Sequence, residues 1–300
     1  MKKLYGITTA MTTPFDKFGA VDVGSLEEQV RFLISKGVDC LYPVGTTGEM
    51  LLCTLEERKL IARTVVEAAA GDATVFVHVG AIAQTDTIEL ARHAERIGAD
   101  GIGVVTPPFH VMNERALEEF YCAVCGAVSE NFPVYAYNIP QLSGTDLSPE
   151  VLQRIMDRAS NLIGIKYSFP DMSRILDYLT VNDGNISVLP GADHLLLPSL
   201  AMGCDGVVSG CSGPYPEPFV EIYRLFNEGE WERARQVQIA VNRVIVALRG
   251  GADMSIFKAA LTRRGVPAGF VRKPLVELPH EEMASVMAVL EELTSGLITD

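Results

Sequence analysis

Asn161-Leu162-Ile163-Gly164-Ile165-Lys166 is the stretch that says most about the fold of this 300-residue chain. The run is short, rich in branched apolar residues and bounded by polar ones, which is the pattern of a buried strand. Lys166 then stands at the carboxyl end of a strand, where α/β proteins build their active sites. Burying an ammonium there is costly, which favours the free amine that Schiff-base chemistry requires. The alternative is a lysine that reaches solvent or pairs with a carboxylate.

Similar apolar runs recur along the chain, at residues 5–8, 40–44, 74–79, 101–105, 134–137, 162–166, 186–189 and 206–209. Helical patterns fall between most of them, for example at residues 25–36, 55–70, 86–97 and 114–129. Strands that alternate with helices predict a parallel sheet, and eight such units predict a closed (β/α)₈ TIM barrel. The fold class expected from the sequence is therefore α/β.

The last part of the chain exceeds what a barrel needs. Helical patterns cover residues 218–227, 230–249, 255–264 and 281–293. The first completes a barrel domain expected at residues 1–228, and the others predict a C-terminal helical extension, residues 229–300, packed on it. Ser25 and Thr54 precede acidic residues and are expected to cap helices, while Gly37, Gly98 and Gly203 are expected to end them.

Composition excludes several classes of function. The net charge is −13, and the 25 basic residues are scattered among 38 acidic ones, so a nucleic-acid partner is not expected. Residues 1–6 lack the apolar core of a signal peptide, and no run approaches the length of a membrane span. The six cysteines show no disulfide framework, which predicts a cytoplasmic location. Cys122 and Cys125 form a CxxC inside a helical pattern, where packing is the expected role.

Two further strand ends carry reactive side chains. The strand in residues 133–140 ends with Tyr135 and Tyr137, which share a face, so the pattern does not choose between them. The strand in residues 40–44 runs into Gly45-Thr46-Thr47-Gly48-Glu49, where backbone amides and two hydroxyls can hold an anion. An ordinary turn in which Thr46 or Thr47 caps a helix is the alternative. An amine, a phenol and an anion site together suit a 2-oxo acid held by its carboxylate.

These segments resemble the dihydrodipicolinate synthase / N-acetylneuraminate lyase family of pyruvate-dependent class I aldolases. The resemblance rests on residues 45–49, on Tyr137-Asn138-Ile139-Pro140 and on Gly164-Ile165-Lys166, and it runs from residues 6–10 to residues 272–274. It implies that Lys166 forms a Schiff base with the ketone and that Tyr137 transfers protons, assisted by Thr46. It also implies substrate contacts from the following residues: Thr46, Thr47, Gly48, Ser168, Gly191, Asp193 and Val208.

The family chemistry needs neither a metal nor an organic cofactor, because the protonated imine on the lysine serves as the electron sink. The expected reaction is cleavage of a 2-oxo acid to pyruvate and an aldehyde. The resemblance also implies a small-molecule substrate and a homotetramer built as a dimer of dimers.

Departures from the family pattern concern substrate choice. The synthase branch has an arginine where this chain has Leu142, so a carboxylated aldehyde is disfavoured, whereas residues 137–144 resemble the sialic-acid lyase branch. That branch has an Asp-Glu pair where this chain has Asp193-His194, and each of these two residues is either a polyol ligand or a structural residue. Phe109 replaces a relay tyrosine, so the relay is truncated or rerouted through His110 or water.

The expected substrate is therefore a sialic-acid-like or 2-keto-3-deoxy sugar acid. Alternatives are a dehydratase or hydratase-aldolase that acts on a related 2-oxo acid, dihydrodipicolinate synthase itself, and a non-catalytic pyruvate-binding regulatory protein.

Overall fold

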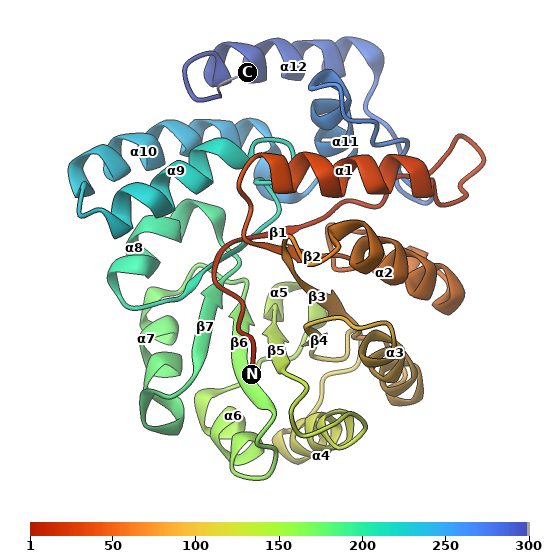
Figure 1. Ribbon diagram of the computed structural model, residues 1–300, viewed down its shortest axis with the longest axis vertical. Coiled ribbons are helices and arrows are strands. Elements are labelled where there is room, and N and C mark those ends of the chain that lie inside the picture. Colours follow the sequence, from red (N-terminus) through yellow and green to blue (C-terminus); the bar gives the residue numbers. More distant parts are fainter. Residues whose placement is uncertain (299–300) are drawn as a thin grey trace.

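The chain forms a barrel of eight parallel strands in the computed structural model, which describes residues 1–298 (Figure 1). Consecutive strands pair in the order β7-β6-β5-β4-β3-β2-β1-β8. The two ends of the sheet meet where the amide of Asp205 donates to the carbonyl of Val188 at 3.2 Å. The strands are β1 Gly6–Ala10, β2 Cys40–Tyr42, β3 Thr74–His78, β4 Gly101–Val105, β5 Val134–Asn138, β6 Leu162–Tyr167, β7 Ser187–Pro190 and β8 Gly206–Ser209.

Helices surround the barrel because each strand is buried almost throughout and needs an apolar cover on its outer side. The helices are α1 Val23–Ser35, α2 Leu55–Ala69, α3 Gln84–Arg96, α4 Glu114–Cys125, α6 Pro149–Met156, α7 Met172–Thr180, α8 Leu196–Ala201 and α9 Pro216–Asn227. A short helix, α5 Pro140–Ser143, lies in the loop after β5. The predicted (β/α)₈ barrel is confirmed.

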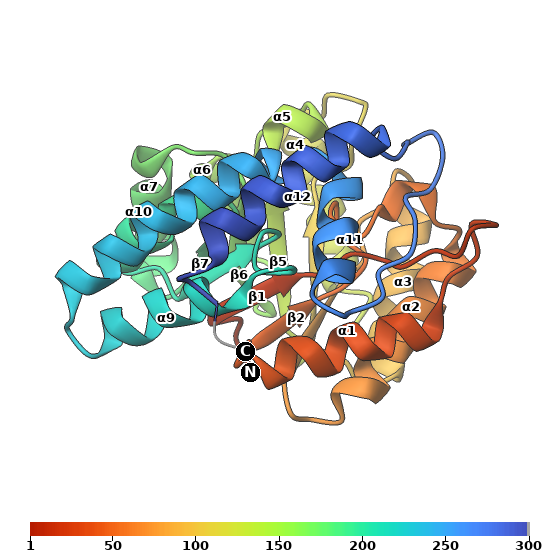
Figure 2. The same ribbon diagram turned by 90° about the horizontal axis from the view of Figure 1, so that it is seen from above.

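The predicted C-terminal helical extension is also present. It comprises α10 Trp231–Ala247, α11 Met254–Arg263 and α12 His280–Thr294. Helix α10 packs against α9 and α12, and Figure 2 shows α10 and α12 running close together on one side of the barrel. The predicted domain limit at residue 228 falls between α9 and α10. Within residues 1–298, no helix is long and apolar enough to cross a membrane.

Several predicted boundaries were wrong, and two of the errors have clear causes. The strand predicted at residues 40–44 ends at Tyr42, because Val44 adopts a left-handed backbone with φ of 61°. Helix α1 is capped by Asp22, whose carboxylate accepts from the Ser25 amide, rather than by Ser25. The Thr54 cap of α2 is confirmed, with a reciprocal contact from Glu57. The predicted glycine ends of the helices, at residues 37, 98 and 203, all have positive φ.

Candidate active site

A cavity of about 380 Å³ opens at the carboxyl ends of the strands, where the sequence places its candidate residues. Its walls come from the loops after several strands and from the end of α10. All the predicted site residues except Gly48 line it, namely Thr46, Thr47, Tyr137, Lys166, Ser168, Gly191, Asp193 and Val208. A barrel brings together residues that are far apart in the chain, because all its strands end at the same rim.

Lys166 lies near the carboxyl end of β6 and is only 5% exposed. Its Nζ is 4.0 Å from the ring centre of Tyr137 and 5.0 Å from that of Tyr42. No carboxylate within residues 1–298 forms an ion pair with Lys166, and the side chain is buried. The alternative in which this lysine reaches solvent or pairs with a carboxylate is therefore wrong. An amine in such an apolar, aromatic setting is suited to nucleophilic chemistry.

The structure separates the two tyrosines of β5. Tyr135 accepts a hydrogen bond from the Leu4 amide at 3.1 Å, which places its hydroxyl at the amino-terminal end of the barrel. Tyr137 lines the cavity, and its hydroxyl lies 3.3 Å from Thr46 Oγ1. The two share a strand face but serve opposite ends of the barrel, and only Tyr137 is near Lys166.

Residues 45–49, called the cradle from here on, form a tight turn. The Gly48 amide donates to the Gly45 carbonyl at 3.0 Å, and Thr13 Oγ1 donates to the Gly48 carbonyl at 2.8 Å. A side chain at position 48 would come within 3.2 Å of Thr13 and of the backbone at Val44. Gly48 thus shapes the turn without lining the cavity, whereas Thr46 and Thr47 line it together with Lys166.

His78 was not singled out from the sequence as a functional residue, yet it supports the cradle. Its Nδ1–H donates to the carbonyl of Val44 at 3.0 Å, which holds a branched residue in a backbone region that such residues rarely adopt. Burial, together with Arg58 and Lys166, lowers the pKa of His78 well below its ordinary value. The ring is therefore neutral. Tyr137 and Lys166, which line the cavity, and the rings of His78 and Tyr42, which pack against them, are here called the floor, and each of the four is at most 5% exposed.

The opposite wall carries polar groups that can meet the rest of a substrate. Asp193 is buried, its Oδ1 has no partner among the described residues, and burial raises the pKa of its carboxyl. Ser168 lies beside Gly191, where an added Cβ would come 1.8 Å from Ser168 Oγ. Gln141 donates to the Ser168 carbonyl at 2.6 Å, which ties α5 to the loop after β6.

The outer edge of the cavity is exposed and contains residues from separate loops. Leu142, His194, Gly250 and Ala252 are here called the rim. Leu142 is 61% exposed and offers no polar group. Phe109 is 85% exposed, and neither it nor His110 lines the cavity of the single chain.

The extension contributes lining residues that the sequence did not reveal. Ile245 comes from α10, and Gly250, Gly251 and Ala252 follow it. The adjacent glycines after α10 were the one sequence feature that could have indicated this contribution, since glycine lets the backbone approach a site closely.

Comparison with known proteins shows which family the chain belongs to. Residues 3–293 match the model of the dihydrodipicolinate synthetase family. An uncharacterized DapA-like lyase of Halobacterium salinarum is 36% identical over 97% of this chain and 94% of its own length. The 4-hydroxy-tetrahydrodipicolinate synthase of Methanocaldococcus jannaschii is 33% identical over 98% and 99% of the two chains.

A solved structure from the same family has the same fold. YagE of Escherichia coli, a prophage protein of this family crystallised with pyruvate, is 28% identical, with a TM-score of 0.92 over 99% of this chain and 100% of its own. The chain belongs to the dihydrodipicolinate synthetase family and is a class I aldolase, a carbon–carbon lyase that acts through a lysine Schiff base.

Proposed function

We propose that the protein cleaves a 2-oxo acid with a hydroxyl on C4, of the 2-keto-3-deoxy sugar acid or sialic-acid-like class, to pyruvate and an aldehyde. The main support for this proposal is the arrangement of side chains in the floor of the cavity. It places an unpaired, buried amine beside a phenol whose hydroxyl reaches a threonine hydroxyl.

The chemistry begins with the Lys166 amine, which attacks the C2 ketone while the hydroxyls of Thr46 and Thr47 and the cradle amides hold the carboxylate. Loss of water gives a protonated imine. Tyr137, with Thr46 as its proton partner, removes the proton of the 4-hydroxyl. The C3–C4 bond breaks, the aldehyde leaves, and the bonding electrons form an enamine. Protonation of C3 and hydrolysis of the imine release pyruvate and restore the free amine.

The polar wall opposite the cradle supports a polyhydroxylated substrate. Asp193, Ser168 and His194 line the cavity, and their side chains can accept hydrogen bonds from substrate hydroxyl groups. Lys166 is the only lysine or arginine among the described lining residues, so a second carboxylate would find no charged partner.

A second candidate is 4-hydroxy-tetrahydrodipicolinate synthase, which condenses pyruvate with a carboxylated aldehyde. The names of relatives such as that of M. jannaschii favour it. Leu142 argues against it, because a charge-assisted hydrogen bond contributes about 1.5–3 kcal/mol that leucine cannot supply.

A screen with purified protein tests the choice. Each 2-keto-3-deoxy acid, with sialic acid included, is added with lactate dehydrogenase and NADH, so that released pyruvate consumes NADH. We expect the best of these substrates to be turned over much faster than pyruvate and aspartate semialdehyde are condensed. The opposite ranking would assign the protein to the synthase reaction.

We also propose how the chains assemble and in which compartment the protein acts. Four large apolar side chains from loops at the carboxyl end of the barrel are more than half exposed, which is typical of an interface: Leu51, Ile82, Phe109 and Val111. We propose a homotetramer in which this face pairs chains two by two, in the cytoplasm. Sedimentation at micromolar concentration should give a tetramer or a dimer, and a monomer would contradict the proposal.

A further inference from the structure

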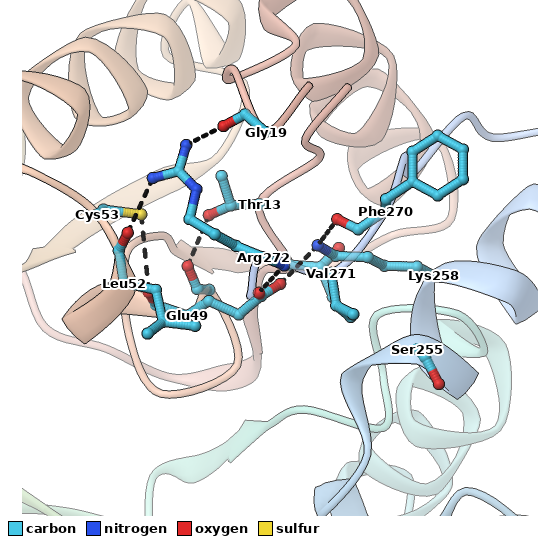
Figure 3. Close-up of polar contacts among 12 residues, drawn as sticks. Thr13, Gly19, Glu49, Leu52, Cys53, Ser255, Lys258, Phe270, Val271 and Arg272 are labelled. Carbon is cyan, nitrogen blue, oxygen red and sulfur yellow. Dashed lines mark hydrogen bonds and ion pairs between the residues drawn. The ribbon is translucent and has the colours of Figure 1, made fainter. Parts of the chain in front are cut away.

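A buried ion pair joins the cradle to the C-terminal extension. Glu49 closes the cradle and adopts a left-handed backbone with φ of 57°. Its Oε1 lies 2.5 Å from Nζ of Lys258 on α11, and the side chains of both residues are 1% exposed (Figure 3). The ammonium also donates to the Phe270 carbonyl at 2.6 Å. The two residues of the pair are separated by 209 positions in the sequence.

Arg272 holds the other side of the same turn. Its backbone amide donates to Glu49 Oε2 at 2.8 Å, so each oxygen of that carboxylate has a partner in the extension. Its guanidinium donates to the Leu52 carbonyl at 2.9 Å and to both carboxylate oxygens of Glu57 on α2, at 2.8 and 2.7 Å. As Figure 3 shows, Arg272 contacts both Glu49, the last residue of the cradle, and Leu52, which lies just beyond it.

An aromatic ring lies between the two cations. The ring centre of Phe15 is 4.0 Å from the guanidinium carbon of Arg272 and 4.6 Å from Lys258 Nζ. The Phe270 amide donates to the Phe15 carbonyl at 2.8 Å, and Gly269 permits this approach, because a Cβ there would lie 2.2 Å from that carbonyl oxygen. The segment before α12 is thus fixed to the loop that follows β1.

Stability alone does not explain this arrangement. Desolvating two charges costs about as much as their attraction returns, so a buried ion pair is a weak source of folding free energy. What the pair does supply is a fixed position, because both carboxylate oxygens of Glu49 are held by groups from a distant part of the chain, while its backbone is bonded to Thr46 and Leu52 nearby. The residue so fixed follows Thr46, Thr47 and Gly48 directly.

We propose that Lys258 and Arg272 are positioning residues of the cradle, through which the C-terminal extension sets where Thr46 and Thr47 meet the substrate carboxylate. The inference rests on the proposed function only for the identity of the bound group. A cradle displaced by about 1 Å would weaken binding and orientation of the carboxylate even though Lys166, on β6, keeps its place.

Lys258→Met tests the proposal, with Arg264→Met as the matched control. Arg264 follows α11 and forms a mostly buried ion pair with Glu217 on α9, with Nη2 and Oε1 2.5 Å apart, without touching the cradle. Both variants lose one partner of a buried pair, so a general loss of stability affects both. Where Lys258→Met does not fold, Glu49→Gln, which retains the shape and an acceptor oxygen, takes its place.

Two measurements are made on the full-length protein. Borohydride trapping at increasing pyruvate concentrations gives the concentration for half-maximal adduct on Lys166 and the maximal extent. Hydrogen exchange followed by mass spectrometry reports the amides of residues 45–52. For Lys258→Met we expect the half-maximal concentration to rise by on the order of tenfold with an unchanged maximum, and exchange of these amides to become faster. Arg264→Met should change neither.

Unchanged trapping and exchange in Lys258→Met, or an equal change in Arg264→Met, would overturn the positioning role. If pyruvate leaves no adduct on the wild-type protein, it is the proposed function that fails. Hydrogen exchange of the amides in residues 45–52 then tests the positioning role by itself. Faster exchange in Lys258→Met alone supports that role, and unchanged exchange overturns it.

Discussion

The floor and the rim of the cavity are built in different ways. Floor residues such as Lys166 and Tyr137 lie on neighbouring strands, are nearly inaccessible, and have positions set by the register of β5 and β6. Rim residues such as Leu142 and His194 lie in short helical turns within the loops after β5 and β7 and are exposed. A change in the floor disturbs packed neighbours, whereas a change in the rim alters only what the substrate meets. We therefore expect the floor to carry out the chemistry and the rim to determine which aldehyde is accepted.

Replacing Lys166 should have the largest effect. Lys166→Met keeps the length and apolar stem of the side chain but removes the nucleophile. We expect pyruvate release to fall by about 10³-fold or more in the lactate-dehydrogenase assay, because no other residue can form the imine. The thermal midpoint should not fall, since a buried amine is exchanged for a buried thioether. Retention of substantial activity would remove Lys166 from the mechanism.

Tyr137→Phe should have the next largest effect. Loss of the phenol should reduce kcat by about 10²–10⁴-fold, because proton transfer is lost while the ring still packs against Lys166. Tyr135→Phe is the control. It leaves the Leu4 amide without its partner and should lower stability by about 1–3 kcal/mol with little change in kcat. If the two variants had similar kcat values, the assignment of Tyr137 would be wrong.

A smaller effect is expected from His78, whose protonation should make the stability of the protein depend on pH. Burial lowers the pKa of His78 in the folded protein, while the unfolded chain takes up a proton near the ordinary value of 6.5. The unfolded state thus binds more protons below that pH, and this one group reduces the free energy of unfolding by up to about 1.4 kcal/mol per pH unit as pH falls.

His78→Asn retains an N–H donor for the Val44 carbonyl and does not titrate. The thermal midpoint of this variant, measured between pH 5 and 7.5, should fall less steeply with acid than that of the wild type. His93, whose pKa burial also lowers, acts equally in both proteins. Identical slopes would show that His78 is not held neutral in the folded state.

The smallest effect is expected at the rim. Leu142→Arg supplies a cation for a carboxylated aldehyde, and we expect the ratio of kcat/KM values for aspartate semialdehyde over the best sugar acid to rise by no more than about tenfold. The gain is small because an exposed guanidinium without supporting contacts recovers only part of its binding energy. Leu142→Gln, which is polar but uncharged, is the control. A loss of catalysis with every substrate would show that the rim also carries chemistry.

The sequence was sufficient for the barrel and for Lys166 and Tyr137 of the floor, because strand periodicity and the βα order bring strand ends together whatever the details of the loops, but it did not indicate His78 or Tyr42. Strand periodicity could not choose between Tyr135 and Tyr137, since a period of two places both on one face; the family resemblance indicated Tyr137, and barrel geometry separates the ends that the two serve. The left-handed backbone of Val44 was missed because nothing in the local sequence marks it, and the partner of its carbonyl, His78, lies on another strand. The link between Glu49 and Lys258 depends on how α11 docks, which local sequence patterns do not encode.

Schiff-base formation on Lys166 is tested most directly by treating the wild-type protein with pyruvate and borohydride and mapping the product by mass spectrometry. We expect one reduced pyruvyl adduct per chain, located on Lys166, and none in Lys166→Met. An intact, folded protein with no adduct, or with the adduct on another lysine, would contradict this expectation.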